Sequence, residues 1–587
     1  MCWWIGFIAS LVLLIVAVIA IFVFSGTRLI KGKKIKLSYI IKGGMIFLAV
    51  LAMFLPVHKA AGEGVKGFFL SIFYSMQLLG LDAGFEDIAI CAPACYQIWA
   101  SIVFCVAPVL TFGFVLTLFK DVYSSCRLWL CLRCRKAFYV FSELNDKSLA
   151  LASDIKAKNK KAVIVFTDVF ERNEEKIYEL IEQAEILGAI CFKKDILVLR
   201  FLKGTNKSVS FFTIGSNETE NLNQGLKLIE KYNDRDNTHI YIFSTKIESE
   251  LLLTAANKGK VKVRRVNEVR SLINRILYEN GEIIFDSAKV REDGEKLISA
   301  VVIGMGNHGT EMVKALSWFG QMDGYKLEIN AFDRDPLAEE KFVALAPELM
   351  SPKYNGVYVD GEAQYKIEIH PDVDVQSISF VNKIKQITDT TYVFVALGND
   401  DINVKTAVDL RMHFERMNIH PKIQTVVYDT HQKKALEGIR NFKKQDYDIE
   451  FVGDIESSYA ESVIIDSELE NDALQRHLKY GEEEEFWTYE YNYRSSVASA
   501  IHMKARIKCG ILGADKAEGE LTEEERNTIE ALEHRRWNAY MRSEGYVFSG
   551  SKDKSSRNDL AKMHHDLVDF SSLSDEDKRK DSRVGTK

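Results

Sequence analysis

The stretch 299–335, SAVVIGMGNHGTEMVKALSWFGQMDGYKLEINAFDRD, decides the fold of the region around it. Residues 300–303 are a short β-branched run that predicts a strand, and residues 310–319 carry apolar side chains at helical spacing. The turn between them, 304–309, has the pattern G-x-G-x-x-G, and a second predicted strand, 327–332, follows the helix. This order of strand, turn, helix and strand predicts an open, parallel α/β sheet.

The glycines of this turn have separate expected roles. Gly304 permits the tight turn, Gly306 lets the backbone approach a pyrophosphate, and Gly309 lets the helix pack against the strand. The helix N-terminus then faces the anion, and Asp333, at the end of the second strand, can accept hydrogen bonds from ribose hydroxyls. The pattern predicts a mononucleotide or dinucleotide site. The alternative is a Rossmann-like fold whose glycine turn serves packing and binds nothing.

Length and composition indicate several domains and exclude some partners. The chain has 587 residues, too many for one core, and a formal net charge of -6 gives no overall basic field for nucleic acid. Its nine cysteines contain no paired C-x-x-C motifs, since Cys131 and Cys134 stand alone, so we assign no metal.

The first 136 residues predict a transmembrane domain that contacts the lipid bilayer. Three apolar runs are long enough to cross it, at about 3–24, 39–57 and 94–119. Lysine and arginine cluster after the first and third runs, which predicts that both clusters are cytoplasmic and that the N-terminus lies outside. The shorter apolar segment 65–79 then cannot cross fully. It is either a re-entrant pore helix or an interfacial helix on the outer surface.

The loop after this segment is acidic. Its three carboxylates are Asp82, Glu86 and Asp87, and it has no lysine or arginine. Repeated by symmetry, these residues predict acidic rings at the outer mouth of a cation pathway. The alternative is that they are solvated and far from any axis.

A first cytosolic α/β domain is predicted at 155–285, and it is a partial copy of the second, at 296–470. Residues 210–218 correspond to 392–401, and residues 240–246 correspond to 425–431. The run 166–170, FTDVF, stands where we expect the glycines, so the first domain has a degenerate turn and the second carries the nucleotide.

Tandem Rossmann-like domains behind membrane spans, with IGMGNHG, FDRD, VALGNDD and TVVYDT in order, resemble the RCK or TrkA-N domains that regulate potassium channels and Trk-type transporters. The T-V-G-Y-G motif of a potassium filter is absent from the sequence. The resemblance implies a nucleotide ligand, NAD(H) or another adenine nucleotide, or a cyclic or nucleotide-derived second messenger. The candidate binding residues are Gly304, Gly306, Asn307, His308, Gly309, Asp333, Arg334, Gly398 and Asn399.

Residues 486–587 predict a helical linker and a small all-α domain. Thr522 and Glu525 have the spacing of a capping box, and the helix after them contains EHRRWNAY, followed by EGY. This pattern is similar to the RyR repeat, named for ryanodine receptors, and the resemblance implies a bacterial sensor of nucleotide-derived signals. The ligand candidates are His534, Arg535, Arg536 and Trp537, which offer charge and a stacking face. The alternative is that His534 and Trp537 are core and the arginines are solvated.

These patterns favour a ligand-gated, cation-conducting protein of the bacterial inner membrane, with its C-terminal domains in the cytoplasm. Three spans and one pore helix cannot enclose a pathway alone, so we expect a homotetramer. The rival is a non-conducting, membrane-tethered nucleotide sensor or antiviral defence effector that disrupts the membrane or signals through a partner. An NAD-dependent enzyme is disfavoured, because no substrate domain with a placed acid, base or nucleophile follows the glycine turn.

Overall fold

The computed structural model describes residues 120–586, except 170–174, 202–205, 247, 293, 359–361, 440–447, 466 and 512, and isolated residues before 120. The predicted spans, the segment 65–79 and the acidic loop with Asp82, Glu86 and Asp87 lie outside the described residues, apart from those isolated positions. Among the described residues, no helix combines the length and apolar character needed to cross a bilayer.

The chain divides into two compact units, Met1–Lys136 with Val163–Val198, and Ala137–Ala162 with Leu199–Lys587. In the first unit, β2 and β3 pair in parallel. The elements described there are α6 (Lys120–Cys134), β2 (Val163–Phe166), α8 (Glu175–Ile186) and β3 (Ile190–Cys191), with a 3-10 turn at Ile196–Val198.

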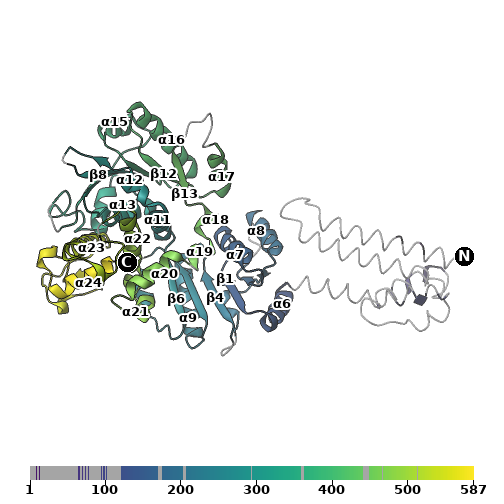
Figure 1. The fold of residues 1–587 in the computed structure, drawn as a ribbon. Helices are drawn as coiled ribbons and strands as arrows, with labels where there is room; N and C mark the ends of the chain where they lie inside the picture. The colour runs from purple at the N-terminus through teal and green to yellow at the C-terminus, as the bar shows by residue number, and fades with distance from the viewer. Residues whose placement is uncertain are drawn as a thin grey trace. The chain divides into compact units, whose positions relative to one another are not determined.

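The second unit contains two sets of parallel strands, each flanked by helices (Figure 1). In one, β1 pairs with β4, β4 with β5, and β5 with β6, all in parallel. Its elements are β1 (Ala137–Phe141), α7 (Asp146–Lys158), β4 (Ser208–Thr213), α9 (Glu218–Tyr232), β5 (Thr238–Phe243), α10 (Glu248–Ala255) and β6 (Lys262–Val266). Two short helices, α11 (Glu268–Asn280) and α12 (Glu282–Asp286), lead to the other.

The other sheet has the order β10-β9-β8-β11-β12-β13, all parallel, with the short β7 antiparallel to β8. Its strands are β7 (Lys289–Val290), β8 (Lys296–Ile303), β9 (Tyr325–Phe332), β10 (Tyr365–His370), β11 (Tyr392–Val395), β12 (Lys422–Val426) and β13 (Ile449–Val452). Its helices are α13 (Asn307–Phe319), α14 (Ala338–Leu345), α15 (Ile378–Gln386), α16 (Asp400–Arg416) and α17 (Thr430–Ile439). The predicted parallel, Rossmann-like α/β architecture is confirmed.

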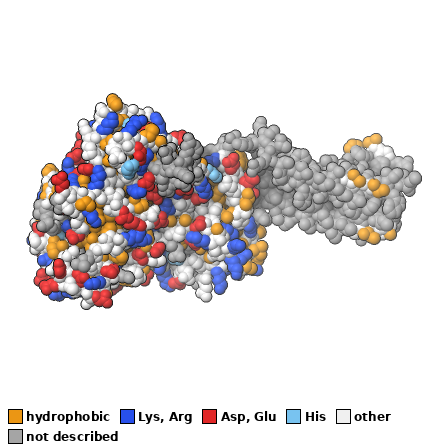
Figure 2. Space-filling view, turned by 45° about the horizontal axis from the view of Figure 1, so that its top comes forward, with side chains coloured by type: hydrophobic (Ala, Val, Ile, Leu, Met, Phe, Trp, Pro, Cys, Tyr) orange, Lys and Arg blue, Asp and Glu red, His pale blue; other side chains and the backbone are white. Residues whose placement is uncertain are grey.

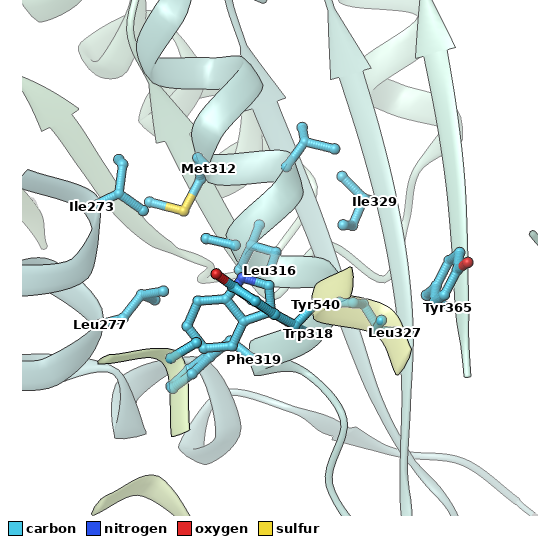
Figure 3. Packing of buried hydrophobic residues seen from close by; sticks show 14 of the residues in the cluster. Ile273, Leu277, Met312, Leu316, Trp318, Phe319, Leu327, Ile329, Tyr365 and Tyr540 are labelled. Atoms are coloured by element: carbon cyan, nitrogen blue, oxygen red, sulfur yellow. The ribbon is translucent and has the colours of Figure 1, made fainter. Parts of the chain in front are cut away.

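Helices cover both faces of this second sheet. Successive residues of β8 point to opposite faces, so Val301 and Ile303 join the cluster that contains Leu410 of α16, while Ala300 and Val302 join the cluster of α13. Figure 3 shows α13 side chains packed between those of α11 and β9. Burying each such Leu, Ile or Phe side chain contributes about 1.5–3 kcal/mol.

The C-terminal helices complete this core, which corrects the prediction of a separate, all-α domain at 486–587. Ile501 of α22 and Tyr540 of α23 belong to the same buried cluster as Phe319, and Tyr540 packs edge-on against Trp318 with ring centroids 6.2 Å apart (Figure 3). The elements after β13 are α18 (Ile455–Ser458), α19 (Glu461–Ile464), α20 (Glu468–His477), α21 (Glu483–Thr488), α22 (Glu490–Lys508), α23 (Glu523–Ser543), β14 (Val547–Phe548), β15 (Met563–His564) and α24 (Asp575–Gly585).

Two details of the sequence interpretation have different outcomes. The capping box of Thr522 and Glu525 is confirmed at the start of α23. The predicted start of the first α/β domain at 155 is too late, because β1 precedes it and α7 begins at Asp146. The stretch is polar in sequence because α7 buries one apolar face, including Leu149 and Ile155, and leaves its charged residues half-buried or exposed.

Candidate functional site

The glycine turn between β8 and α13 has the three predicted environments. Gly304 has a φ of +92°, and a Cβ atom there would lie 2.5 Å from the carbonyl oxygen of Ala396. A Cβ on Gly309 would lie 1.7 Å from the carbonyl oxygen of Gly304, so this glycine serves packing. A Cβ on Gly306 would meet nothing within 4 Å. Only Gly306 therefore leaves space for something outside the fold.

That space is a cavity of about 550 Å³ at the carboxyl ends of the parallel strands. Open α/β folds bind ligands at this edge. Seven predicted residues line the cavity: Gly304, Gly306, Asn307, His308, Asp333, Arg334 and Gly398. Gly309 is buried outside the lining, and Asn399 caps α16 by accepting a hydrogen bond from the backbone N–H of Ile402 at 3.0 Å.

The structure adds wall residues that the sequence interpretation did not name. Asp374 and Gln376 follow β10, Asn403 lies on α16, and Tyr428 follows β12. The rule that ligands bind at the carboxyl ends of parallel strands would have selected Tyr428, because it lies in the TVVYDT motif already matched to a strand end. Asp374 had no comparable signal, since the strand before it was not identified.

Asp333 joins the glycine turn to the end of β9. Its Oδ2 accepts a hydrogen bond from the N–H of Met305, and its Oδ1 accepts one from the N–H of Asp335 at 2.7 Å. Each carboxylate oxygen has two lone pairs, so the group can still accept from ribose hydroxyls. The N-cap of α13, Gly306, has no side-chain hydrogen bond to the first turn. The N–H groups of that turn can then donate hydrogen bonds to an anion or to water.

His308 and Tyr428 form a pair at the cavity wall. The Tyr428 hydroxyl lies 3.3 Å from Nδ1 of His308, and the two rings meet edge to face with centroids 5.8 Å apart. Burial lowers the pKa of His308, so the imidazole is neutral at pH 7. Burial, with the nearby Asp400, raises the pKa of Tyr428 to about 12. Both groups therefore act as uncharged hydrogen-bond partners for a ligand.

The first sheet has a side-chain-filled turn at the equivalent place. Phe141 pairs with Phe212 of β4 as Val302 pairs with Phe394 of β11. Continuing this register to the N-caps of α7 and α13 places Glu143, Asn145 and Ser148 at the positions of the three glycines. The degenerate turn therefore follows β1 and not β2, which corrects its predicted place at 166–170.

These side chains close the turn of the first sheet. Asn145 donates from Nδ2 to the carbonyl oxygen of Ile214 at 2.7 Å, and its side chain caps α7. The Glu143 carboxylate accepts from the N–H of Ser216 at 3.3 Å. A carboxylate in this position repels a phosphate, so the first turn is unsuited to a pyrophosphate.

A second cavity, of about 530 Å³, lies among α22, α23, the β15 segment and α24. Three of the four C-terminal candidates line it: His534, Arg536 and Trp537. Arg535 does not, and its guanidinium lies 3.5 Å from Asp323. His534 and Arg536 are each only 1% exposed. Arg536 is therefore buried and not solvated.

Two of these side chains have carboxylate partners. His534 Nδ1 lies 3.3 Å from a carboxylate oxygen of Asp581, and its Nε2 lies 2.8 Å from the carbonyl oxygen of Val568. Burial lowers the pKa of His534, but these two acceptors outweigh burial and the pKa is raised. Arg536 donates from Nη2 to Glu533 at 2.6 Å.

Glu544, at the end of α23, lines the same cavity and collects cations from three other helices. Its Oε1 accepts from Arg270 of α11 at 3.0 Å and from Lys314 of α13 at 3.3 Å, and its Oε2 accepts from Arg494 of α22 at 2.8 Å. Arg494 also donates to Glu250 of α10 at 2.7 Å. These ion pairs connect the C-terminal cavity to the helix that follows the glycine turn and to the first sheet.

His564, His565 and Asp566 form the one group among the described residues that is spaced closely enough for a metal. The two imidazoles are stacked, with centroids 4.7 Å apart and an interplanar angle of 11°. Stacked rings direct their in-plane lone pairs side by side rather than to one point. The sequence interpretation did not single out this group.

Fold and site together define a protein with two parallel, Rossmann-like α/β sheets, one of which has an open cavity at its carboxyl edge. No protein-family model matches the chain. No curated protein matches it either.

Proposed function

We propose that the chain is a nucleotide-regulated, ion-conducting membrane protein of the bacterial inner membrane, most simply a cation channel that assembles as a homotetramer. The regulatory ligand is NAD(H), another adenine nucleotide, or a nucleotide-derived second messenger. It binds in the cavity lined by Gly306, His308 and Asp333.

The single observation that carries the nucleotide assignment is the open space at Gly306. The other two glycines of the turn are needed for backbone geometry, whereas Gly306 faces a cavity of about 550 Å³ beside an uncapped helix N-terminus. A phosphate there accepts hydrogen bonds from backbone N–H groups and lies at the positive end of the helix dipole. Asp333 is at the next strand end, where ribose hydroxyls lie in dinucleotide-binding folds.

The ion pairs of Lys314 and Arg270 with Glu544 support a regulatory function for this site. Lys314 lies on the helix whose N-terminus faces the cavity, so a ligand that shifts α13 also shifts its contacts with α11, α22 and α23. Ligand binding changes a conformational equilibrium only through such a difference in contacts between two states.

The test is electrical recording from the purified full-length chain in planar bilayers, with NAD, NADH or ATP added to the cytosolic side. We expect one of these to change the open probability, and Gly306→Val to remove the response without removing the conductance. Nucleotide binding by the wild type, with no conductance in either protein, would establish the rival function of a non-conducting, membrane-tethered sensor.

A further inference from the structure

The C-terminal cavity of about 530 Å³ carries an inference of its own because of the polar atoms in its wall. Several buried side-chain atoms there have no hydrogen-bond partner among the described residues. They are Arg494 Nε, Ser499 Oγ, Arg536 Nε, Arg536 Nη1 and His565 Nδ1. Buried polar groups without partners are rare, and each costs about 1–3 kcal/mol.

The atoms of Arg494, Ser499 and Arg536 share one property, which is that they can donate a hydrogen bond. Nε2 of His565 lies 3.3 Å from the Asp566 carboxylate, so its Nδ1 is the acceptor of the neutral ring. The carboxylates of the wall, by contrast, already have donors. The Glu533 carboxylate accepts hydrogen bonds from Arg506 and Arg536. The Glu544 carboxylate forms ion pairs with Arg270, Lys314 and Arg494. A cavity whose unused groups are mostly donors is complementary to a ligand rich in acceptors.

The charge around Arg536 points the same way. Arg506 and Arg536 are both 1% exposed, and they share the single carboxylate of Glu533. Two buried guanidinium groups on one carboxylate leave an excess positive charge. An uncompensated buried charge is expensive, and an anion within hydrogen-bond distance removes that cost.

We propose that this cavity is a second ligand site, which binds a small molecule through a phosphate or carboxylate group held by Arg536 with help from Ser499. The side chain of Trp537 forms an adjacent wall, against which a planar part of the ligand packs. The inference extends the proposed function by assigning chemistry to a second site on the same chain. It rests on residues that the cavity at Gly306 does not share.

The experiment uses the full-length protein in detergent with the Gly306→Val substitution, so that the first cavity cannot contribute. Thermal unfolding is followed during titration with inorganic pyrophosphate and, separately, with citrate, at constant ionic strength. The low-millimolar range lies below the concentrations at which such salts stabilise proteins generally. We expect a saturable rise in unfolding temperature with one of them, and the responding probe separates a phosphate from a carboxylate ligand.

Arg536→Met in this background tests the anchor. We expect apparent affinity to fall at least about tenfold, the effect of losing charge-assisted hydrogen bonds. Without ligand, the variant should unfold at the same or a higher temperature than its parent, because the excess buried charge is gone. Arg579→Met, which removes an exposed arginine of α24 outside this wall, is the matched control and should respond like the parent.

Ser499→Ala provides a second variant in case Arg536→Met does not fold. Its hydroxyl has no partner among the described residues, so its removal should leave the fold intact and weaken binding several-fold. The proposal is overturned if neither probe gives a saturable shift in the parent, or if the Arg536 or Ser499 variant responds as the parent does. If wild-type protein showed no nucleotide response at the Gly306 cavity, that result would count against the proposed function and not against this site.

Discussion

At the scale of single residues, Gly306 and Gly309 are close in the chain, but an added Cβ atom would meet different surroundings. At Gly306 it would have open space, and at Gly309 it would collide with the carbonyl oxygen of Gly304. One glycine is therefore available to a ligand and the other is required by the fold.

This difference predicts that Gly306→Val abolishes nucleotide binding with little change in unfolding temperature. Gly309→Ala should instead lower the free energy of unfolding by on the order of 2 kcal/mol or more, because overpacking displaces backbone. Calorimetric titration with NAD and ATP, combined with thermal unfolding, measures both effects. Unchanged affinity in Gly306→Val would remove the nucleotide from this cavity.

His564 gives a pH-dependent prediction. Burial lowers its pKa to about 3, with smaller effects in the same direction from Arg557, His565 and His534 and an opposing effect from Asp577. In the unfolded chain, this imidazole binds its proton near pH 6.5. The stability that comes from neutral His564 is therefore fully present above that pH and is lost as the pH falls towards about 3.

We therefore expect the free energy of unfolding to fall between pH 6.5 and 5 by about 2 kcal/mol less in His564→Phe than in wild type. Phenylalanine keeps the ring that packs edge-on against Trp537, at 4.9 Å between centroids. Denaturant unfolding at the two pH values measures the difference. His420→Phe, at a side chain that is 62% exposed, should behave as wild type; equal acid sensitivity in both variants would contradict the assignment.

At the scale of elements, the two sheets share a hydrogen-bonding arrangement. In each, a buried asparagine of the helix α16 or α9 bonds to backbone groups at the ends of two neighbouring strands. In the second sheet, the buried Asn403 accepts from the N–H of Leu397 at 2.6 Å and donates to the carbonyl oxygen of Val426 at 2.8 Å. In the first, Asn221 accepts from the N–H of Gly215 at 2.7 Å and donates to Phe243 at 3.0 Å. The repeat noticed in the sequence thus extends to equivalent hydrogen bonds.

This repeat supplies a matched pair of substitutions. Asn403→Ala and Asn221→Ala should each lower the free energy of unfolding by about 2 kcal/mol or more, because both leave buried backbone groups unpaired. Only Asn403 lines the nucleotide cavity, so only its variant should also weaken nucleotide binding. Equal nucleotide affinities in the two variants would show that the hydrogen bonds of Asn403 beside β11 do not shape the site.

Glu544 tests the ion pairs that join four helices. Burial raises its pKa, but Arg270, Lys314 and Arg494 outweigh burial and hold the pKa well below its usual range. Glu544→Gln should cost about 3–5 kcal/mol of stability, because it leaves buried cations without their partner. Glu576→Gln removes an ion pair whose carboxylate side is 74% exposed, and should cost about 1 kcal/mol or less. Denaturant unfolding compares the two.

At the scale of the whole molecule, acidic and basic side chains both occur across the visible face of the part that the structure describes (Figure 2). The predicted membrane domain stays a prediction, since its spans lie outside the described residues. The expected homotetramer would bring the acidic loop of each subunit, with Asp82, Glu86 and Asp87, around one axis.

We expect substitution of these three residues by asparagine or glutamine to reduce cation preference, because acidic rings concentrate cations and repel anions. The measurement is the reversal potential in asymmetric salt, recorded from the full-length chain. A shift towards anion permeability places the loop in the pathway. An unchanged reversal potential and conductance would exclude these residues from it.

The sequence was sufficient for the strand, turn and helix at 299–335, because the roles of Gly304, Gly306 and Gly309 depend on backbone geometry within one βα unit. It was less reliable for the polar stretch that forms α7. The charged face of α7 concealed a helix that belongs to the first sheet, and the degenerate turn was consequently assigned to the wrong strand.

By itself, then, the sequence determined the parallel α/β class and seven of the residues that line the cavity beside Gly306, since alternating burial and glycine conformation are local properties of a chain. Only the tertiary structure decided that α22 and α23 complete the core of the second sheet. It alone also showed that Glu544 pairs with Arg270 and Lys314, and that Arg536 is buried with unused donors. The physical reason is that the charge and stacking potential of an arginine are visible in its type, whereas its burial and partners can depend on distant residues, as the pairing of Arg270 with Glu544 does.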